Sequence, residues 1–196
     1  MAKIKILIEG RVKKTENGWL ASPSTVLIKD GEVNILVDPG SDKELLVKKL
    51  AEENLQCADI DIVFLTHHHL DHTLNLRLFP DCDILLDTDM MNGADEIFTY
   101  SDKIPKTNIK IIPTPGHTID HESLLVQTDR GKICVAGDLF WWLENEEQKT
   151  DYESLISRQD PNGAKDELVL KESRKLVLEL ADWVIPGHGP MFRSPK

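Results

Sequence analysis

Long hydrophobic runs are missing from this sequence of 196 residues. The longest unbroken apolar segment, residues 139–143, is far shorter than the ~18 apolar residues that a membrane-spanning helix needs. The N-terminal MAKIKILIEG alternates lysine with aliphatic residues. It lacks the continuous apolar block that follows the basic start of a signal peptide. We therefore expect no membrane association and a cytoplasmic location.

Cysteine and basic residues are also scarce. The three cysteines, Cys57, Cys82 and Cys134, form no CxxC pair, which argues against a disulfide framework and for a reducing compartment. The 23 Lys and Arg are outnumbered by 34 Asp and Glu, and the formal net charge is -11. Such a charge repels polyphosphates, so nucleic acid is a disfavoured partner. We expect a small-molecule substrate, and the composition leaves a homo-oligomer open.

Short aliphatic runs alternate with turn residues and with two segments of helical length. Asp30-Gly31 and Arg130-Gly131 predict tight turns between strands, and Asp42 or Ser41 and Asp166 are suitable helix caps. The pattern predicts one mixed α and β domain over residues 1–196. The expected strands are residues 3–8, 25–29, 33–37, 61–65, 83–86, 109–112, 123–128, 132–136 and 183–185, and the expected helices are residues 42–53 and 166–180.

The strand at residues 61–65 runs directly into THHHLDH, a dense group of metal-ligand side chains. If the chain stays extended, His67 and His69 project to one side and His68 to the other, because side chains alternate along a strand. Asp71 and His72 follow where the chain must turn, so their side chains can point to a neighbouring position and bind a second metal ion. This short segment therefore predicts parts of two metal sites.

Three more candidate ligands follow other predicted strands. His117 lies in PTPGHT, His188 in PGHGP, and Asp138 directly after the strand at residues 132–136. Some of these residues also have an ordinary structural explanation. Asp138 alone could be a helix cap or turn residue, and the other histidines His68 and His121 are more simply surface or hydrogen-bonded residues. The concentration of histidines at Gly-rich and Pro-rich strand exits favours metal binding for the group.

The series His67-x-His69-x-Asp71-His72, followed by His117, Asp138 and His188, resembles the metallo-β-lactamase superfamily signature. The resemblance covers about residues 24–192, and Asp38-Pro39-Gly40 matches an early Asp-x-Gly element of that family. It implies an α+β fold, a four-layer αββα sandwich in which two sheets face each other with helices outside. The segments at residues 74–80 and 182–192 resemble one small branch of the superfamily.

The resemblance also implies a ligand set. His67, His69 and His117 would hold one metal ion, Asp71, His72 and His188 a second, and Asp138 would bridge the two. Asp71 and Asp138 would also act in catalysis, and Asp38 would support the ligand loop. Two features separate the sequence from known branches: Asp138 stands where class B1 lactamases have Cys, and only a short tail follows His188, without the helical domain of glyoxalase II. Asp120 replaces a common Gly, which puts the local loop shape in doubt.

Ligands that are all nitrogen or oxygen favour two divalent zinc ions and also fit iron or manganese. Two such ions would hold a bridging hydroxide, so we expect a dinuclear hydrolase that attacks an ester, thioester or other acyl substrate. A locally cationic site would admit an anionic small molecule. The alternatives are a phosphodiesterase or ribonuclease with the same site, a mononuclear iron dioxygenase of the same superfamily, and a purely structural metal site.

Two further features are open to opposite interpretations. The aromatic residues in the segment 139–143 could line a substrate pocket, or Phe140 and one of Trp141 and Trp142 could pack in the core. Arg158, Lys165 and Arg193 could bind substrate or be plain surface charge.

Overall fold

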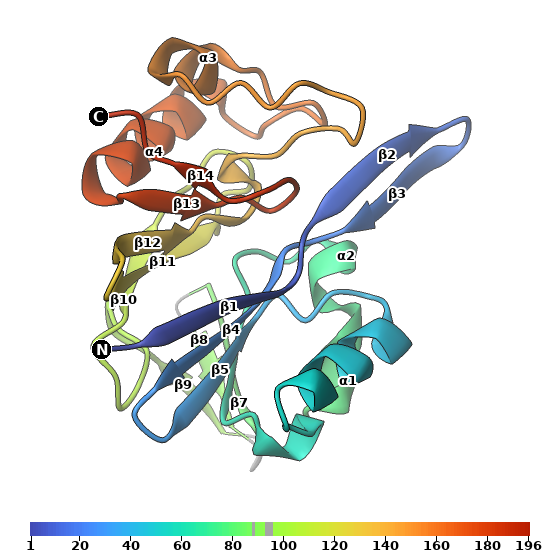
Figure 1. Cartoon of the computed structure of the whole chain (residues 1–196), viewed down its shortest axis with the longest axis vertical. Coiled ribbons are helices and arrows are strands. Elements are labelled where there is room, and N and C mark those ends of the chain that lie inside the picture. Colours follow the sequence, from blue (N-terminus) through green and yellow to red (C-terminus); the bar gives the residue numbers. More distant parts are fainter. Residues whose placement is uncertain (88, 93–95) are drawn as a thin grey trace.

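Two β-sheets lie face to face, with helices on both outer sides (Figure 1). The computed structural model describes residues 1–87, 89–92 and 96–196. Helix α1 (Lys43–Glu52) covers one sheet, and α3 (Tyr152–Ser157) and α4 (Glu167–Leu180) cover the other. This is the α+β, four-layer αββα arrangement that the resemblance implies.

Within the described residues, the first sheet has seven strands in the order β1-β4-β5-β6-β7-β8-β9. Strands β5, β6 and β7 run parallel to one another, so their carboxyl ends meet at one edge of the sheet. The strands of this sheet are β1 (Lys3–Ile8), β4 (Thr25–Asp30), β5 (Val33–Val37), β6 (Ile62–Phe64), β7 (Asp83–Leu86), β8 (Asp89–Met91) and β9 (Ile97–Thr99).

The second sheet has five strands in the order β10-β11-β12-β13-β14. Strands β12 and β13 are parallel, and the chain between them forms α3 and α4. The strands of this sheet are β10 (Lys110–Pro113), β11 (Glu122–Thr128), β12 (Gly131–Val135), β13 (Trp183–Ile185) and β14 (Phe192–Arg193).

Three apolar clusters hold the layers together. One lies between the sheets and contains Val37 and Phe64 from the first and Val126 and Val135 from the second. A second cluster packs α1 on the first sheet, and a third packs α3 and α4 on the second. Successive strand residues point to opposite faces of a sheet, and here many residues of both sets are apolar. Each sheet therefore has an apolar cluster on both sides, as a four-layer sandwich requires.

The sequence predicted nine strands and two helices that the structure contains, within one or two residues at each end. Asp42 accepts a hydrogen bond from the Leu45 amide at the start of α1, and Asp166 accepts from the Leu168 and Val169 amides at the start of α4. Both tight turns are present, between β4 and β5 and between β11 and β12.

A long hairpin, β2 (Arg11–Thr15) and β3 (Gly18–Ser22), was missed. It extends away from the two sheets at the edge where α2 (Leu70–Thr73) lies (Figure 1). The dipeptide Asn17-Gly18 at its tip is a common hairpin signal. However, the basic segment RVKKT before it and the segment GWLAS after it lack the alternating apolar pattern of a half-buried strand. The short strands β8, β9 and β14 and the helices α2 and α3 were also not predicted.

None of the helices in the described part of the chain has the length and apolar content that crossing a bilayer requires.

The packing of α1 gives a first testable prediction. Leu46 is fully buried against the first sheet, whereas the adjacent Val47 is 42% exposed. Leu46→Ala should lower the free energy of unfolding by about 2–5 kcal/mol, because it leaves a cavity under the helix. Val47→Ala is the matched control and should change it by less than about 0.5 kcal/mol. Denaturant unfolding measures both values, and equal effects would contradict the placement of α1.

Candidate metal centre

The candidate ligands lie where strands of both sheets end at the same edge of the sandwich. His67 follows β6, and Asp71 and His72 lie on α2 just beyond it. From the second sheet come His117, Asp138 and His188, which follow β10, β12 and β13. The structure therefore brings together all seven residues that the sequence suggested, from four separate strand exits.

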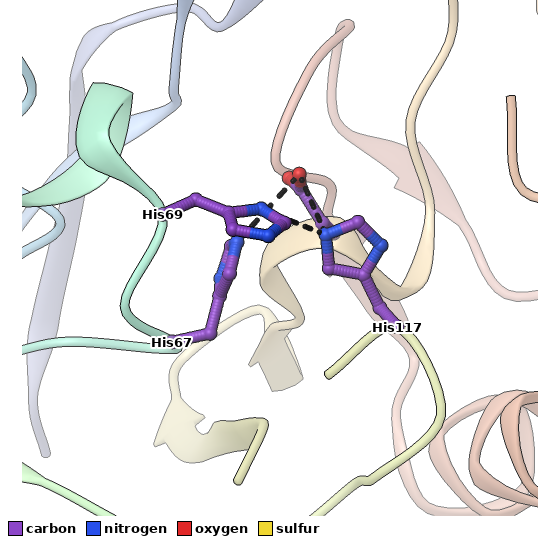
Figure 2. A group of neighbouring side chains, drawn as sticks. His67, His69 and His117 are labelled. Carbon is purple, nitrogen blue, oxygen red and sulfur yellow. Dashed lines mark hydrogen bonds and ion pairs between the residues drawn. The ribbon is translucent and has the colours of Figure 1, made fainter. Parts of the chain in front are cut away.

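The first group consists of His67, His69, His117 and Asp138 (Figure 2). Its ligand atoms all lie within 4.8 Å of one another. Asp138 Oδ2 is 3.8 Å from His67 Nε2 and 3.4 Å from His117 Nε2, and His117 Nε2 is 3.1 Å from His69 Nδ1. Figure 2 shows the three labelled rings turned toward a common point.

The second group consists of Asp71, His72 and His188. Asp71 Oδ2 is 3.7 Å from His72 Nε2 and 3.5 Å from His188 Nε2. The other oxygen of Asp138, Oδ1, is 3.5 Å from each of these two nitrogens. One carboxylate thus faces both groups, with one oxygen toward each.

Hydrogen bonds on the far side of the rings fix which nitrogen can bind a cation. The Thr66 hydroxyl donates to the Asp38 carboxylate at 2.8 Å, so its 3.0 Å contact with His67 Nδ1 requires a proton on that nitrogen. His188 Nδ1 donates to the Ser22 carbonyl at 2.9 Å. In both rings Nε2 then carries the lone pair, and it points toward the other ligands.

Two carboxylates orient the remaining buried rings. Asp38 Oδ2 lies 2.9 Å from His72 Nδ1, and Asp160 Oδ2 lies 2.6 Å from His117 Nδ1. Asp38 also accepts from the Thr66 amide at 2.9 Å, so it holds the chain on both sides of His67. Carboxylates behind metal-binding imidazoles commonly fix the ring and raise its basicity.

Several candidate ligand atoms are buried without a hydrogen-bond partner, which indicates that the site is suited to a cation. His67 Nε2, His72 Nε2 and Asp138 Oδ1 are buried and have no hydrogen-bond partner. A buried polar atom left unpaired costs about 1–3 kcal/mol. The Nε2 lone pairs and the carboxylate oxygens that they face are all acceptors, so they cannot hydrogen-bond to each other directly. A cation or a proton between them can interact with both. Nitrogen and carboxylate donors without sulfur suit zinc, iron or manganese.

Electrostatics favour positive charge at the same point. His67 itself stays neutral, as a metal ligand must, because burial lowers its pKa well below its usual range and the nearby His72 adds to this effect. Burial also opposes charge on His72, but Asp38 and Asp138 outweigh it and raise the His72 pKa well above its ordinary value. The Asp138 pKa is held well below its usual range because His188 and His72 outweigh the effect of burial. The carboxylates that favour a proton on His72 would favour a metal ion at the same place.

His68 and His121 lie outside both ligand groups. His68 is exposed and its Nδ1 is 2.6 Å from Asp120 Oδ2, which agrees with the expected alternation along residues 67–69. His121 is buried, stacks on His67 with ring centroids 5.3 Å apart, and contacts the Thr114 hydroxyl at 2.9 Å. Burial lowers the His121 pKa to about 3, so the ring is a neutral packing partner behind His67.

Two glycines allow the ligand loops to approach neighbouring groups. A Cβ added at Gly187 would lie 1.8 Å from Asp138 Oδ1, so a side chain here would displace the shared carboxylate. Gly116 has φ of +134°, and its Cβ would lie 2.4 Å from the backbone of Leu170 on α4. The His117 loop therefore packs directly on α4, where Ser173 Oγ also donates to the Pro115 carbonyl at 2.7 Å.

A buried arginine connects the loops that carry Asp138 and Asp160. Arg174 of α4 is completely buried, and its Nε donates to the Leu139 carbonyl at 2.7 Å. Its Nη1 donates to the Arg158 carbonyl, two residues before Asp160. Burial lowers the Arg174 pKa to about 10, which leaves the side chain charged at neutral pH.

A cavity of about 280 Å³ opens onto the ligand groups. Trp141 lines it, while Phe140 and Trp142 pack in the cluster beneath α4. The expected pocket lining is thus present at one aromatic residue of the segment 139–143, and the expected core packing at two others. Arg158, Lys165 and Arg193 do not line it, and Arg158 instead pairs with Glu146. The lining comprises Val12, Trp19, Ala21, His69, Leu70, Asp71, His117, Asp138, Trp141, Asn162 and His188.

Sequence reasoning missed Asp160 and the hairpin residues that line the cavity. Asp160 lies in a Gly-rich and Pro-rich stretch, DPNG, without a periodic pattern, and only the fold brings it behind His117. Trp19 was recognisable as an aromatic beside a turn signal, but nothing in the sequence places it near the ligands.

Comparisons with known proteins agree with one another. The family described as the Metallo-beta-lactamase superfamily matches residues 18–81. Metallo-beta-lactamase domain-containing protein 1 of Xenopus laevis is 33% identical over 98% of this chain and 82% of its own length. A Methanocaldococcus jannaschii protein described as a "probable metallo-hydrolase" is 32% identical over 98% of this chain and 90% of its own. The chain spans 59% of the human protein that shares the Xenopus name.

Solved structures show the same fold. A Thermotoga maritima protein described as a candidate metallo-beta-lactamase superposes with a TM-score of 0.73 at 20% identity, covering 98% of this chain and 99% of its own. AidC, a dizinc quorum-quenching lactonase solved with the product N-hexanoyl-L-homoserine, gives 0.70 at 17% identity, with 92% of this chain and 78% of its own covered.

The contact between Asp160 and His117 yields a second prediction. Asp160→Asn removes the charge that orients His117 and should weaken zinc binding by about 10–100-fold. Asp129→Asn, an exposed carboxylate in the turn between β11 and β12, is the matched control and should leave zinc affinity unchanged. Competition with a chromogenic chelator measures both affinities. Equal affinities for the two variants would show that Asp160 does not support the ligand.

The contact at Gly187 yields a third prediction. Gly187→Ala should displace the Asp138 carboxylate and reduce the metal content of the purified protein, because the new methyl group and Oδ1 cannot occupy the same space. Gly31→Ala is the control: Gly31 has a positive φ of +63°, and no atom of the described residues lies within 4 Å of an added Cβ. It should cost about 1 kcal/mol of stability and leave metal content unchanged. Elemental analysis and thermal melting compare the two variants.

Proposed function

This chain belongs to the metallo-beta-lactamase superfamily and is a hydrolase of that family, and we propose that it hydrolyses acyl substrates with two divalent metal ions. The substrates we propose are esters, thioesters and lactones. The ions are zinc in the first instance, although iron and manganese suit the same donors.

The observation that carries the proposal is the shared carboxylate of Asp138. Its Oδ2 faces His67 and His117, and its Oδ1 faces His72 and His188. A structural zinc site is closed by four ligands around one ion. Seven ligand residues in two adjoining groups beside a cavity instead favour two ions with positions left open for substrate.

The proposed roles of the residues follow from their positions. When bound, the two cations would activate a water molecule and polarise the acyl oxygen. His67, His69 and His117 would hold one cation, Asp71, His72 and His188 the other, and Asp138 would hold both together. Asp71 is the more exposed of the two carboxylates, with a side chain 23% exposed against 7% for Asp138. We therefore assign Asp71 to the substrate side and Asp138 to orienting the nucleophilic water.

Two broader features belong to the same proposal. We treat residues 1–196 as one domain, because a single apolar cluster joins strands of both sheets. We also propose a reducing compartment such as the cytoplasm, which is consistent with three cysteines that are all free in the structure.

The decisive experiment combines elemental analysis with a panel of thioester, lactone, β-lactam and phosphodiester substrates. The wild-type protein should carry two metal ions per chain and hydrolyse acyl substrates. Asp138→Asn should lose metal and lower turnover by about 10²-fold or more, because one charge serves both ions. Asp129→Asn is again the matched control and should behave as wild type.

Three outcomes would contradict the proposal. Full metal content and unchanged turnover in Asp138→Asn would remove the role of the bridge. A single iron per chain, with oxygen consumed on a persulfide substrate, would identify a dioxygenase. Cleavage of single-stranded RNA with a steep salt dependence, without acyl hydrolysis, would identify a nuclease.

A further inference from the structure

The cavity at the candidate metal centre is lined by two kinds of side chain. One kind is the candidate ligands, among them His69, Asp71 and His188. The other walls come from Val12, Trp19 and Ala21 of the hairpin, Leu70 of α2, and Trp141, and Asn162 is the remaining polar residue. A substrate placed with its reacting bond at the ligands must therefore extend along apolar side chains.

None of the described residues that line this cavity is a lysine or an arginine. Lys14 lies with its ammonium 5.7 Å from the Trp19 ring, but it does not line the cavity. A carboxylate or phosphate held against these walls would meet no cation, and Asn162 is the one polar side chain besides the ligands among the described lining residues. Hydration lost there would be only partly replaced, which is costly. The apolar wall discriminates against such a group.

The aromatic walls are fixed in place. The ring centroids of Trp19 and Trp141 are 6.1 Å apart at an interplanar angle of 74°. Trp141 in turn lies 5.9 Å from the His188 ring, and a backbone bridge pairs the two residues. The volume of about 280 Å³ lies just below the ~300–1,000 Å³ of typical ligand sites. The space suits a short, unbranched apolar group.

From these walls we propose that the substrate is a small ester, thioester or lactone whose acyl chain is uncharged and apolar, with Trp141, Trp19 and Leu70 determining specificity. This inference rests on the proposed acyl hydrolysis. Water supplies the new bond to the acyl carbon, the bond from that carbon to oxygen or sulfur breaks, and the leaving alcohol or thiol takes a proton. No oxidant or reductant takes part. The anionic substrate that the sequence allowed would find no partner beyond the metal ions.

The first test uses two thioesters that differ only at the end of the chain. S-ethyl pentanethioate carries a methyl group where the S-ethyl monothioester of glutaric acid carries a carboxylate. The metal-loaded protein should hydrolyse the neutral compound with a kcat/KM about tenfold higher, because the apolar wall contacts the methyl group and offers the carboxylate no cation. Equal rates, or a preference for the glutaryl compound, would overturn the inference.

A matched pair of variants tests the position of the wall. Leu70 lines the cavity and is 71% exposed, so Leu70→Arg places a cation at the wall without burying it. This variant should lower the preference for the neutral thioester about tenfold. Leu74→Arg is the control, since Leu74 is 53% exposed nearby but does not line the cavity. The same change in both variants would show that general charge, and not the cavity wall, sets the preference.

A binding measurement separates this inference from the proposed hydrolysis. Hexan-2-one and 5-oxohexanoate match the two thioesters but cannot be hydrolysed. Metal-free protein should bind the neutral ketone more tightly, with shifts of the Trp19 and Trp141 indole N–H signals in NMR spectra. If no thioester is hydrolysed but this selectivity is present, the proposed function fails and the apolar cavity stands. If the two ketones bind equally, the inference fails whatever the catalytic result.

Discussion

Asp138 sets the central constraint of this molecule, because its buried carboxylate faces four imidazoles at distances of 3.4–3.8 Å. Carboxylate oxygens and imidazole lone pairs are all acceptors, so their mutual approach is unfavourable unless positive charge lies between them. The hydrogen bonds of His67 and His188 to Thr66 and Ser22 place protons on the outer nitrogens and leave the inner ones as acceptors. The surrounding structure therefore holds together a group of acceptors that positive charge, from a proton or a bound cation, would stabilise.

The fold supports this arrangement from behind. Asp38 ends one strand and contacts both Thr66 and His72, and Asp160 holds His117 from the loop that precedes α4. Arg174 connects the backbone near Asp138 with the backbone near Asp160. Each ligand loop is thus tied to a rigid element by at least one buried polar contact. Such support keeps ligands in place better than the loops could by themselves.

The sequence predicted most strands and named the seven candidate ligands that the structure brings together, and for a physical reason. Strand runs such as residues 33–37 and 183–185 are bounded by turn residues and are buried on both faces, so their apolar pattern is unambiguous. His117 and His188 were recognisable because each follows such a strand in a rigid Pro and Gly turn. Asp160 was not, because an Asp in a DPNG stretch is an ordinary loop residue until α4 brings it against His117. The cavity wall was equally hidden, since the part that Trp19 plays depends on how the hairpin packs on Trp141.

The ligands come from both halves of the sandwich, with His67, His69, Asp71 and His72 from the side of the first sheet and His117, Asp138 and His188 from the side of the second. Each of the two ligand groups combines residues from both sides, so bound ions would link the two sheets at their shared edge. Part of the free energy of ion binding would then serve to dock one half-sandwich on the other. Separation of the sheets at this edge and release of the ions would be one event.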